Sequence, residues 1–131
     1  MKTKLHLIVS LLIFTTQLTA QTISDSLIAG TWKGTSLCQQ KNSPCHDEQV
    51  VYHISKGDKP NDFIVVANKI VNGEEAEMGT LYFTFNNKEK ELTSTPDDNT
   101  IWKFKITENK MEGTLYYKGA LYRIISLTKS Q

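Results

Sequence analysis

The strongest constraint on the fold is a period of two in short apolar segments. In residues 100–107, Trp102, Phe104 and Ile106 alternate with polar side chains, and residues 78–85 repeat the pattern. This alternation is typical of a β-strand that buries one face. After the first 20 residues, no stretch keeps a helical period for more than two turns. The sequence therefore predicts an all-β fold.

Eight such segments follow one another with short, turn-rich connections. The strands are expected at 28–37, 48–55, 62–71, 78–85, 91–95, 100–107, 110–117 and 120–129. Asn72-Gly73 is a dipeptide suited to a tight hairpin, and short connections make consecutive strands antiparallel neighbours. Joining the first strand to the last removes both exposed edges. We therefore predict a closed, eight-stranded antiparallel up-and-down barrel. A two-sheet β-sandwich is the alternative, and residues 24–28 are expected to form a helical turn that plugs one end.

The N-terminus has the features of a secretory signal peptide. Lys2 and Lys4 precede an apolar run at 5–14, and Ala20 is a small residue in the position that a signal peptidase requires. Cleavage is expected between Ala20 and Gln21. The apolar run is shorter than the roughly 20 residues that span a bilayer as a helix. We therefore expect a secreted or periplasmic protein with no membrane span after signal removal.

The expected mature domain, residues 21–131, is almost neutral. The signal peptide, residues 1–20, contains two lysines and no acidic residue, so 13 Lys and Arg remain against 14 Asp and Glu. Nucleic acids and anionic membrane surfaces attract proteins that concentrate positive charge. We expect one domain, a monomer, and no nucleic-acid partner.

Cys38 and Cys45 are the only cysteines. In an oxidising compartment two thiols this close in sequence are expected to form a disulfide, worth about 2–3 kcal/mol for so short a loop. A metal site with His46 and Asp47 is the alternative, but adjacent residues rarely converge on one ion. An oxidised cysteine is neither a ligand nor a nucleophile. We expect no metal, no cofactor and no enzymatic activity.

Two features resemble the lipocalins and their calycin relatives. Gly30-Thr31-Trp32, at the start of the first expected strand, resembles the Gly-x-Trp motif that opens those barrels. Arg123 is the only arginine and lies on the last expected strand. The resemblance implies that Arg123 packs across Trp32 and helps to close the barrel end, as a guanidinium can on an indole face. It indicates a small secreted bacterial lipocalin-like protein, although the second and third lipocalin motifs are absent.

The two functional hypotheses differ in what the barrel interior does. An eight-stranded barrel is either filled by side chains or holds one small ligand. In the first hypothesis the protein binds a small hydrophobic or amphipathic molecule, and the wall residues are Trp32, Tyr52, Phe83, Phe85, Trp102 and Phe104. In the alternative the core is solid, and the disulfide loop around residues 44–47 contacts a protein or a glycan.

Overall fold

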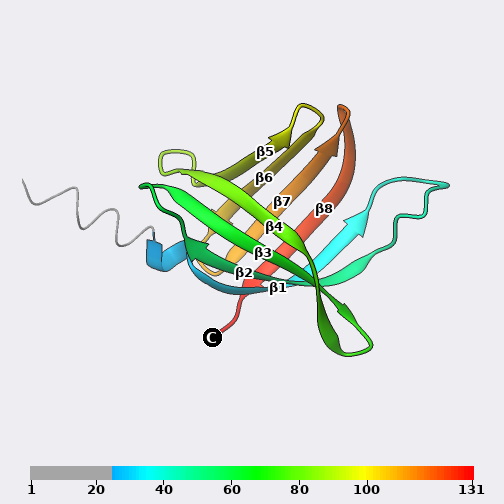
Figure 1. Ribbon diagram of the computed structural model, residues 1–131, viewed down its shortest axis with the longest axis horizontal. Coiled ribbons are helices and arrows are strands. Elements are labelled where there is room, and N and C mark those ends of the chain that lie inside the picture. The colour runs from blue at the N-terminus through cyan, green and yellow to red at the C-terminus, as the bar shows by residue number, and fades with distance from the viewer. Residues whose placement is uncertain (1–24) are drawn as a thin grey trace, which may run out of the picture.

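The computed structural model describes residues 25–131, which form one closed sheet (Figure 1). The strands are Gly30–Cys38 (β1), Glu48–Lys56 (β2), Asp62–Val71 (β3), Glu74–Asn86 (β4), Glu91–Asp97 (β5), Thr100–Thr107 (β6), Lys110–Tyr117 (β7) and Ala120–Lys129 (β8). Each strand pairs antiparallel with the next, and β1 pairs with β8. This confirms the closed up-and-down barrel and excludes the sandwich. The expected signal peptide lies outside the described residues.

The bounds of β3, β6, β7 and β8 match the prediction, whereas β4 and β5 are longer than expected. The β3–β4 hairpin turns on Asn72 and Gly73, whose φ angles of 53° and 82° suit the tightest hairpin class. Glu74 therefore pairs at once with Val71, and β4 begins four residues before its expected start. β5 continues to Asp97, where a turn was expected.

A helical turn at residues 25–28 closes one end of the barrel. Ile28 is completely buried there, and its carbonyl oxygen accepts a hydrogen bond of 2.9 Å from Trp32 Nε1. Lys129 Nζ donates to the carbonyl oxygen of Ser26 at 2.7 Å. Carbonyls that end a helical turn need such donors when they are buried, so the plug is tied to β1 and β8.

The packing of Arg123 on Trp32, implied by the resemblance to lipocalins, is wrong. The β1–β8 register places Lys129 opposite Trp32 and Arg123 opposite Cys38. Six residues of strand separate the two positions, about 20 Å at 3.3 Å per residue. Lys129 takes the expected place, with Nζ at 5.7 Å from the centre of the Trp32 ring. Arg123 instead belongs to the opposite end.

The interior next to the plug is filled by side chains. Phe63 and Phe85 meet edge to face, with ring centroids 6.4 Å apart. The buried side chains around them come from five further strands and are Trp32, Leu92, Ile106, Met111 and Leu127. Over residues 25–131, no helix is long and apolar enough to cross a membrane.

Candidate functional site at the open end of the barrel

One cross-strand row marks the interior at the end away from the plug. In register, Ser94 lies opposite Trp102, Trp102 opposite Leu115, Leu115 opposite Arg123, and Arg123 opposite Cys38. Side chains that oppose one another in register share a face of the sheet. These five residues of β5, β6, β7, β8 and β1 therefore face inward, and we call them the mouth row.

Aromatic rings form the floor beneath the mouth row. Trp102 is half-buried and stacks on Phe104, with ring centroids 6.3 Å apart and an interplanar angle of 13°. Phe104 also meets Tyr52 and Phe83 edge-on, at 6.3 and 5.7 Å. Its ring lies directly over Gly113, where a Cβ atom would come within 2.2 Å of it. The ring position therefore depends on the absence of a side chain at residue 113.

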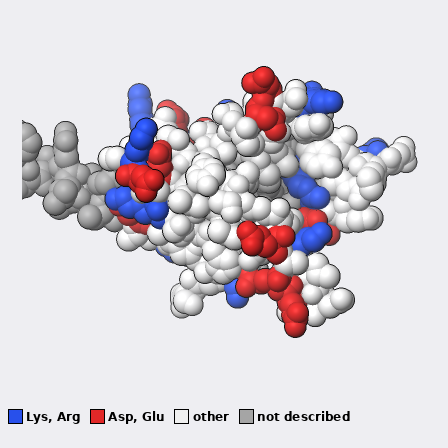
Figure 2. All heavy atoms as spheres, in the orientation of Figure 1, with Lys and Arg blue, Asp and Glu red and all other residues white. Residues whose placement is uncertain are grey.

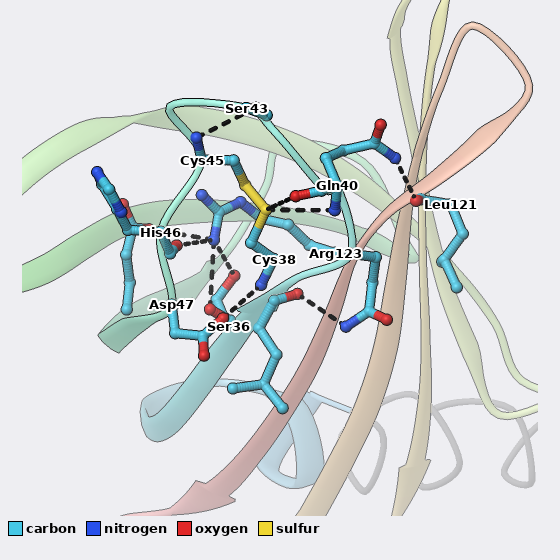
Figure 3. Close-up of a disulfide and its surroundings, with 12 residues drawn as sticks. Ser36, Cys38, Gln40, Ser43, Cys45, His46, Asp47, Leu121 and Arg123 are labelled. Carbon is cyan, nitrogen blue, oxygen red and sulfur yellow. Dashed lines mark hydrogen bonds and ion pairs between the residues drawn. A yellow bond between two sulfur atoms is a disulfide. The ribbon is translucent and has the colours of Figure 1, made fainter.

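Arg123 supplies the charge of the mouth row. Its Nη1 donates to the carbonyl oxygen and the hydroxyl of Ser36, both at 3.2 Å, and to the carbonyl oxygen of His46 at 3.0 Å (Figure 3). The same atom lies 3.7 Å from Glu48 Oε2, and the side chain is only 13% exposed. No residue in 25–131 accepts a hydrogen bond from its Nε or Nη2. A guanidinium has five donor hydrogens, so this one retains unused donors. They are open to solvent, because Asn68 Oδ1 is the only buried side-chain polar atom without a partner in residues 25–131.

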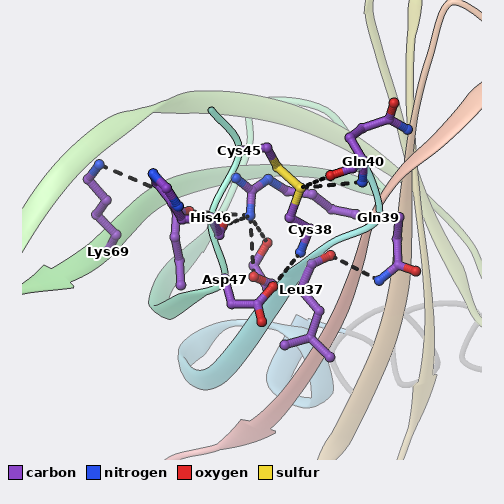
Figure 4. Close-up of polar contacts among 11 residues, drawn as sticks. Leu37, Cys38, Gln39, Gln40, Cys45, His46, Asp47 and Lys69 are labelled. Atoms are coloured by element: carbon purple, nitrogen blue, oxygen red, sulfur yellow. Dashed lines mark hydrogen bonds and ion pairs between the residues drawn. A yellow bond between two sulfur atoms is a disulfide. The ribbon is translucent and has the colours of Figure 1, made fainter. Parts of the chain in front are cut away.

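Two further polar groups surround Arg123. Lys69 extends from β3 toward the disulfide loop (Figure 4), and its Nζ lies 3.9 Å from Glu48 Oε1. Burial raises the pKa of the Tyr52 hydroxyl well above its ordinary value, with the Arg123 charge lowering that pKa and Glu48 raising it. Tyr52 is therefore a neutral hydroxyl at physiological pH. The mouth thus combines an arginine, a lysine and a glutamate above an aromatic floor.

A disulfide fixes the loop beside this mouth. Cys38 and Cys45 are joined, with Cα atoms 5.9 Å apart, which confirms the expected pair (Figure 3). The Cys38 N–H donates to Asp47 Oδ1 at 2.8 Å, and Gln40 Nε2 donates to the carbonyl oxygen of Leu121 at 2.9 Å. The disulfide and the Cys38–Asp47 hydrogen bond therefore hold the two ends of the loop together, and Gln40 ties the loop to β8.

The structure brings together four of the six predicted wall residues. Trp32 and Phe85 belong to the packed, plugged half of the barrel. The other four meet at the mouth, where Trp102 of the mouth row stacks on Phe104, and Tyr52 and Phe83 pack against Phe104. Whether any of them contacts a ligand stays a prediction.

Sequence reasoning missed the polar side of the mouth. Ser36 and Glu48 oppose each other in the β1–β2 register, on the inward face that Trp32 also occupies. Their even spacing from Trp32 and Val50 was the available signal. The signal is weak, because polar residues at the end of an apolar strand face are also typical of ordinary strand ends.

A second polar cluster lies on the outside of the barrel. His53 Nδ1 is 3.2 Å from Thr31 Oγ1, and His53 Nε2 is 2.8 Å from Glu75 Oε1. The hydrogen bond from His53 holds the pKa of the Glu75 carboxyl below its usual range. The chain of contacts ties β1 and β2 to the projecting β3–β4 hairpin. In the part of the chain that is described, no three His, Cys, Asp or Glu side chains gather as a metal site.

Comparison with known proteins adds little to this geometry. No family profile and no curated protein sequence matches the chain. Among solved structures, the chain is similar to one described as "Odorant Binding Protein OBP1", at 14% sequence identity and a TM-score of 0.48. The match covers 82% of this chain and 73% of the other.

Proposed function

We propose that the barrel binds a small amphipathic molecule at its open end, with the polar group of the ligand at Arg123 and its apolar part on Trp102. The observation that carries this proposal is the guanidinium with unused donors in the mouth row. Glu48 already accompanies the charge of Arg123, and an incoming anionic group would take the remaining donors in charge-assisted hydrogen bonds.

The dimensions of the mouth row limit the ligand. Arg123 and Trp102 are two strands apart, through Leu115, which is about 10 Å at the usual strand spacing. Because packed rings fill the interior near the plug, the apolar part of the ligand has to lie near the mouth. A medium-length chain with an anionic end fits these limits better than a large, wholly apolar ligand does.

The test compares dodecanoate with dodecanol, which has the same chain and no charge. Trp102 fluorescence reports binding, because the other tryptophan, Trp32, is buried at the plug. A charge-assisted hydrogen bond is worth about 1.5–3 kcal/mol, so Arg123→Gln should weaken dodecanoate binding by about 10- to 150-fold. Dodecanol affinity should change little.

Lys118→Gln is the matched control, since it removes one positive charge from the exposed β7–β8 turn. It should leave both affinities unchanged. Equal affinity of the parent protein for the two probes, or binding that survives Arg123→Gln, would contradict the proposal.

The disulfide loop supports a second candidate, an interaction module that contacts a protein or a glycan. The loop projects from the barrel between β1 and β2 (Figure 1), and Pro44, His46 and Asp47 are exposed on it. Under this alternative, His46→Ala would abolish partner capture, while Trp102→Ala would leave it intact. The first proposal predicts the reverse for dodecanoate binding.

We also propose that the chain is exported, with residues 1–20 as signal peptide and the barrel in residues 21–131. The Cys38–Cys45 disulfide supports this, because such bonds persist in oxidising compartments. N-terminal sequencing of the protein purified from its native host should find Gln21 as the first residue. A chain that retains residues 1–20 would contradict the cleavage.

A further inference from the structure

The seam between β4 and β5 is the weakest in the barrel. These strands pair only at Thr84–Thr93, Phe85–Leu92 and Asn86–Glu91, whereas every other neighbouring pair shares five to ten positions. Beyond these pairs β4 and β5 diverge around a slit of about 290 Å³, between residues 80–84 and residues 93–96. From residue 82 back to residue 74, β4 pairs only with β3.

The backbone of this free edge can be assigned from the ladder on its other side. The Phe85 N–H donates to the carbonyl oxygen of Asn61, on the β3 side. Backbone groups alternate along an antiparallel strand between its two neighbours, so those of Thr80 and Tyr82 point into the slit. Unpaired N–H and C=O groups on an edge are a template for another strand.

At the hairpin end of β4, odd-numbered residues instead of even-numbered ones have their backbone groups toward the free edge. The β3–β4 register skips Met78, so two residues of β4 oppose one position of β3. After this irregularity the backbone groups of Glu77 and Glu75 point toward the free edge. The free edge therefore presents four residues in turn, two uncharged and two acidic: Tyr82, Thr80, Glu77 and Glu75.

Charge decides what kind of strand fits this edge. Figure 2 shows acidic side chains at the lower edge of the molecule, where Figure 1 places the β3–β4 hairpin, and Glu74, Glu75 and Glu77 are all exposed. A second copy pairing antiparallel along the whole of this edge would set Glu75 against Tyr82 and Glu77 against Thr80, so its glutamates would gain no opposite charge. A strand with basic residues opposite Glu77 and Glu75 would form favourable cross-strand charge pairs there.

We propose that the free edge of β4 binds an extended basic segment of another protein by strand addition. Running antiparallel, its alternate residues would meet Tyr82, Thr80, Glu77 and Glu75 on the outer face of the sheet. Tyr82, which is 71% exposed, offers an aromatic neighbour for a β-branched side chain. The residues between would face the slit beside Leu81, and small apolar side chains suit that place. The preferred segment has alternating small apolar residues, with its basic residues toward the C-terminal end.

The probe is a fluorescein-labelled peptide, Thr-Val-Thr-Val-Lys-Val-Lys, and its matched control carries Glu at both Lys positions. Fluorescence polarisation should show binding of the lysine peptide at least tenfold tighter than of the glutamate peptide. The preference should fall with added salt, because exposed charges are screened. Hydrogen exchange should slow at the Thr80 and Tyr82 amides when the lysine peptide binds.

Two variants separate the edge from the rest of the surface. Thr80→Pro removes one free-edge N–H and leaves the ladder with β3 intact, since proline is tolerated on sheet edges. It should abolish binding, while Thr80→Val, which keeps the N–H, should retain it. Glu77→Lys should exchange the preference of the two peptides, and its circular dichroism spectrum establishes that it folds.

Four results of the peptide experiments would overturn the proposal. They are no binding of the lysine peptide at millimolar concentration, equal binding of both peptides, binding that survives Thr80→Pro, and exchange protection confined to strands other than β4. A concentration-dependent dimer that Thr80→Pro dissolves would also overturn it, because the occupant would then be a second copy.

Discussion

At the residue scale, Trp32 carries the closed end of the barrel. Its ring is completely buried, its Nε1 binds the plug, and the Lys129 amine lies over its face. Trp32→Ala should lower the free energy of unfolding by about 3–5 kcal/mol, measured by urea denaturation. Trp102→Ala is the control and should cost less, because Trp102 is only half-buried. A loss below about 1 kcal/mol for Trp32→Ala would place the mutation among ordinary surface substitutions and contradict this role.

Residue identity alone could not indicate which cation accompanies Trp32. The resemblance to lipocalins put Arg123 beside Trp32, whereas the β1–β8 register places them at opposite ends of the barrel. The partner depends on the β1–β8 register, and a shift of six residues exchanges Arg123 for Lys129. No local pattern in the sequence sets a pairing between strands that are 87 residues apart in the chain.

Tyr52 makes the stability of the folded barrel decrease at alkaline pH. Because burial raises its folded-state pKa above the ordinary value of about 10, only the unfolded chain releases this proton as the pH passes 10. The stability is therefore fully present below about pH 10 and is lost as the pH rises further, by up to about 1.4 kcal/mol per pH unit. Above about pH 10, the free energy of unfolding of Tyr52→Phe, measured by urea denaturation, should fall less steeply with pH than that of the parent protein. The difference in slope should correspond to one proton. An unchanged slope would mean that Tyr52 ionises in the folded protein.

At the element scale, the period of two located every strand, and turn residues set most of their bounds. Two departures have physical causes that extend beyond one strand. β4 reaches back to Glu74 because the Asn72-Gly73 turn is as short as a hairpin permits. The free edge of β4 arises because only three of the seven residues of β5 pair with it, and β5 diverges where its register with β6 shifts between Ser94 and Asp97. This divergence depends on the pairing of three strands, so segment-by-segment reading cannot find it.

The β1–β8 closure depends on the absence of a side chain at Gly34. A Cβ atom there would lie 1.8 Å from the backbone oxygen of Ser126, and backbone cannot move aside as a flexible side chain can. Gly34→Ala should therefore lower the free energy of unfolding by about 2 kcal/mol, within the range of about 1–3 kcal/mol that is typical of overpacking.

Gly79→Ala is the control for that substitution. A Cβ atom at Gly79 meets nothing within 4 Å, and alanine restricts the unfolded chain more than glycine does. Its thermal midpoint should match or exceed that of the parent protein. Equal midpoints for Gly34→Ala and Gly79→Ala would show that β1 and β8 can separate without loss of stability.

At the scale of the whole molecule, the two ends of the barrel have opposite character. One end is plugged by residues 25–28 and packed with apolar side chains, and the other holds Arg123, Glu48 and Lys69 beside a disulfide-bonded loop. Stability is therefore concentrated at the plugged end, and the polar groups of the mouth depend on the loop for their positions. This separation allows the mouth to be altered without unfolding the barrel.

Removing the disulfide tests whether the mouth can be altered without unfolding the plugged end. Replacing Cys38 and Cys45 together by serine should lower the free energy of unfolding by about 2–3 kcal/mol, the chain-entropy value for so short a loop. It should also release the His46 carbonyl from Arg123, a contact that the loop now fixes. We therefore expect dodecanoate affinity to fall several-fold while dodecanol affinity stays near that of the parent. Loss of both affinities in parallel would show that the loop supports the whole interior. Retention of both would show that Arg123 is held by β1 and β8 alone.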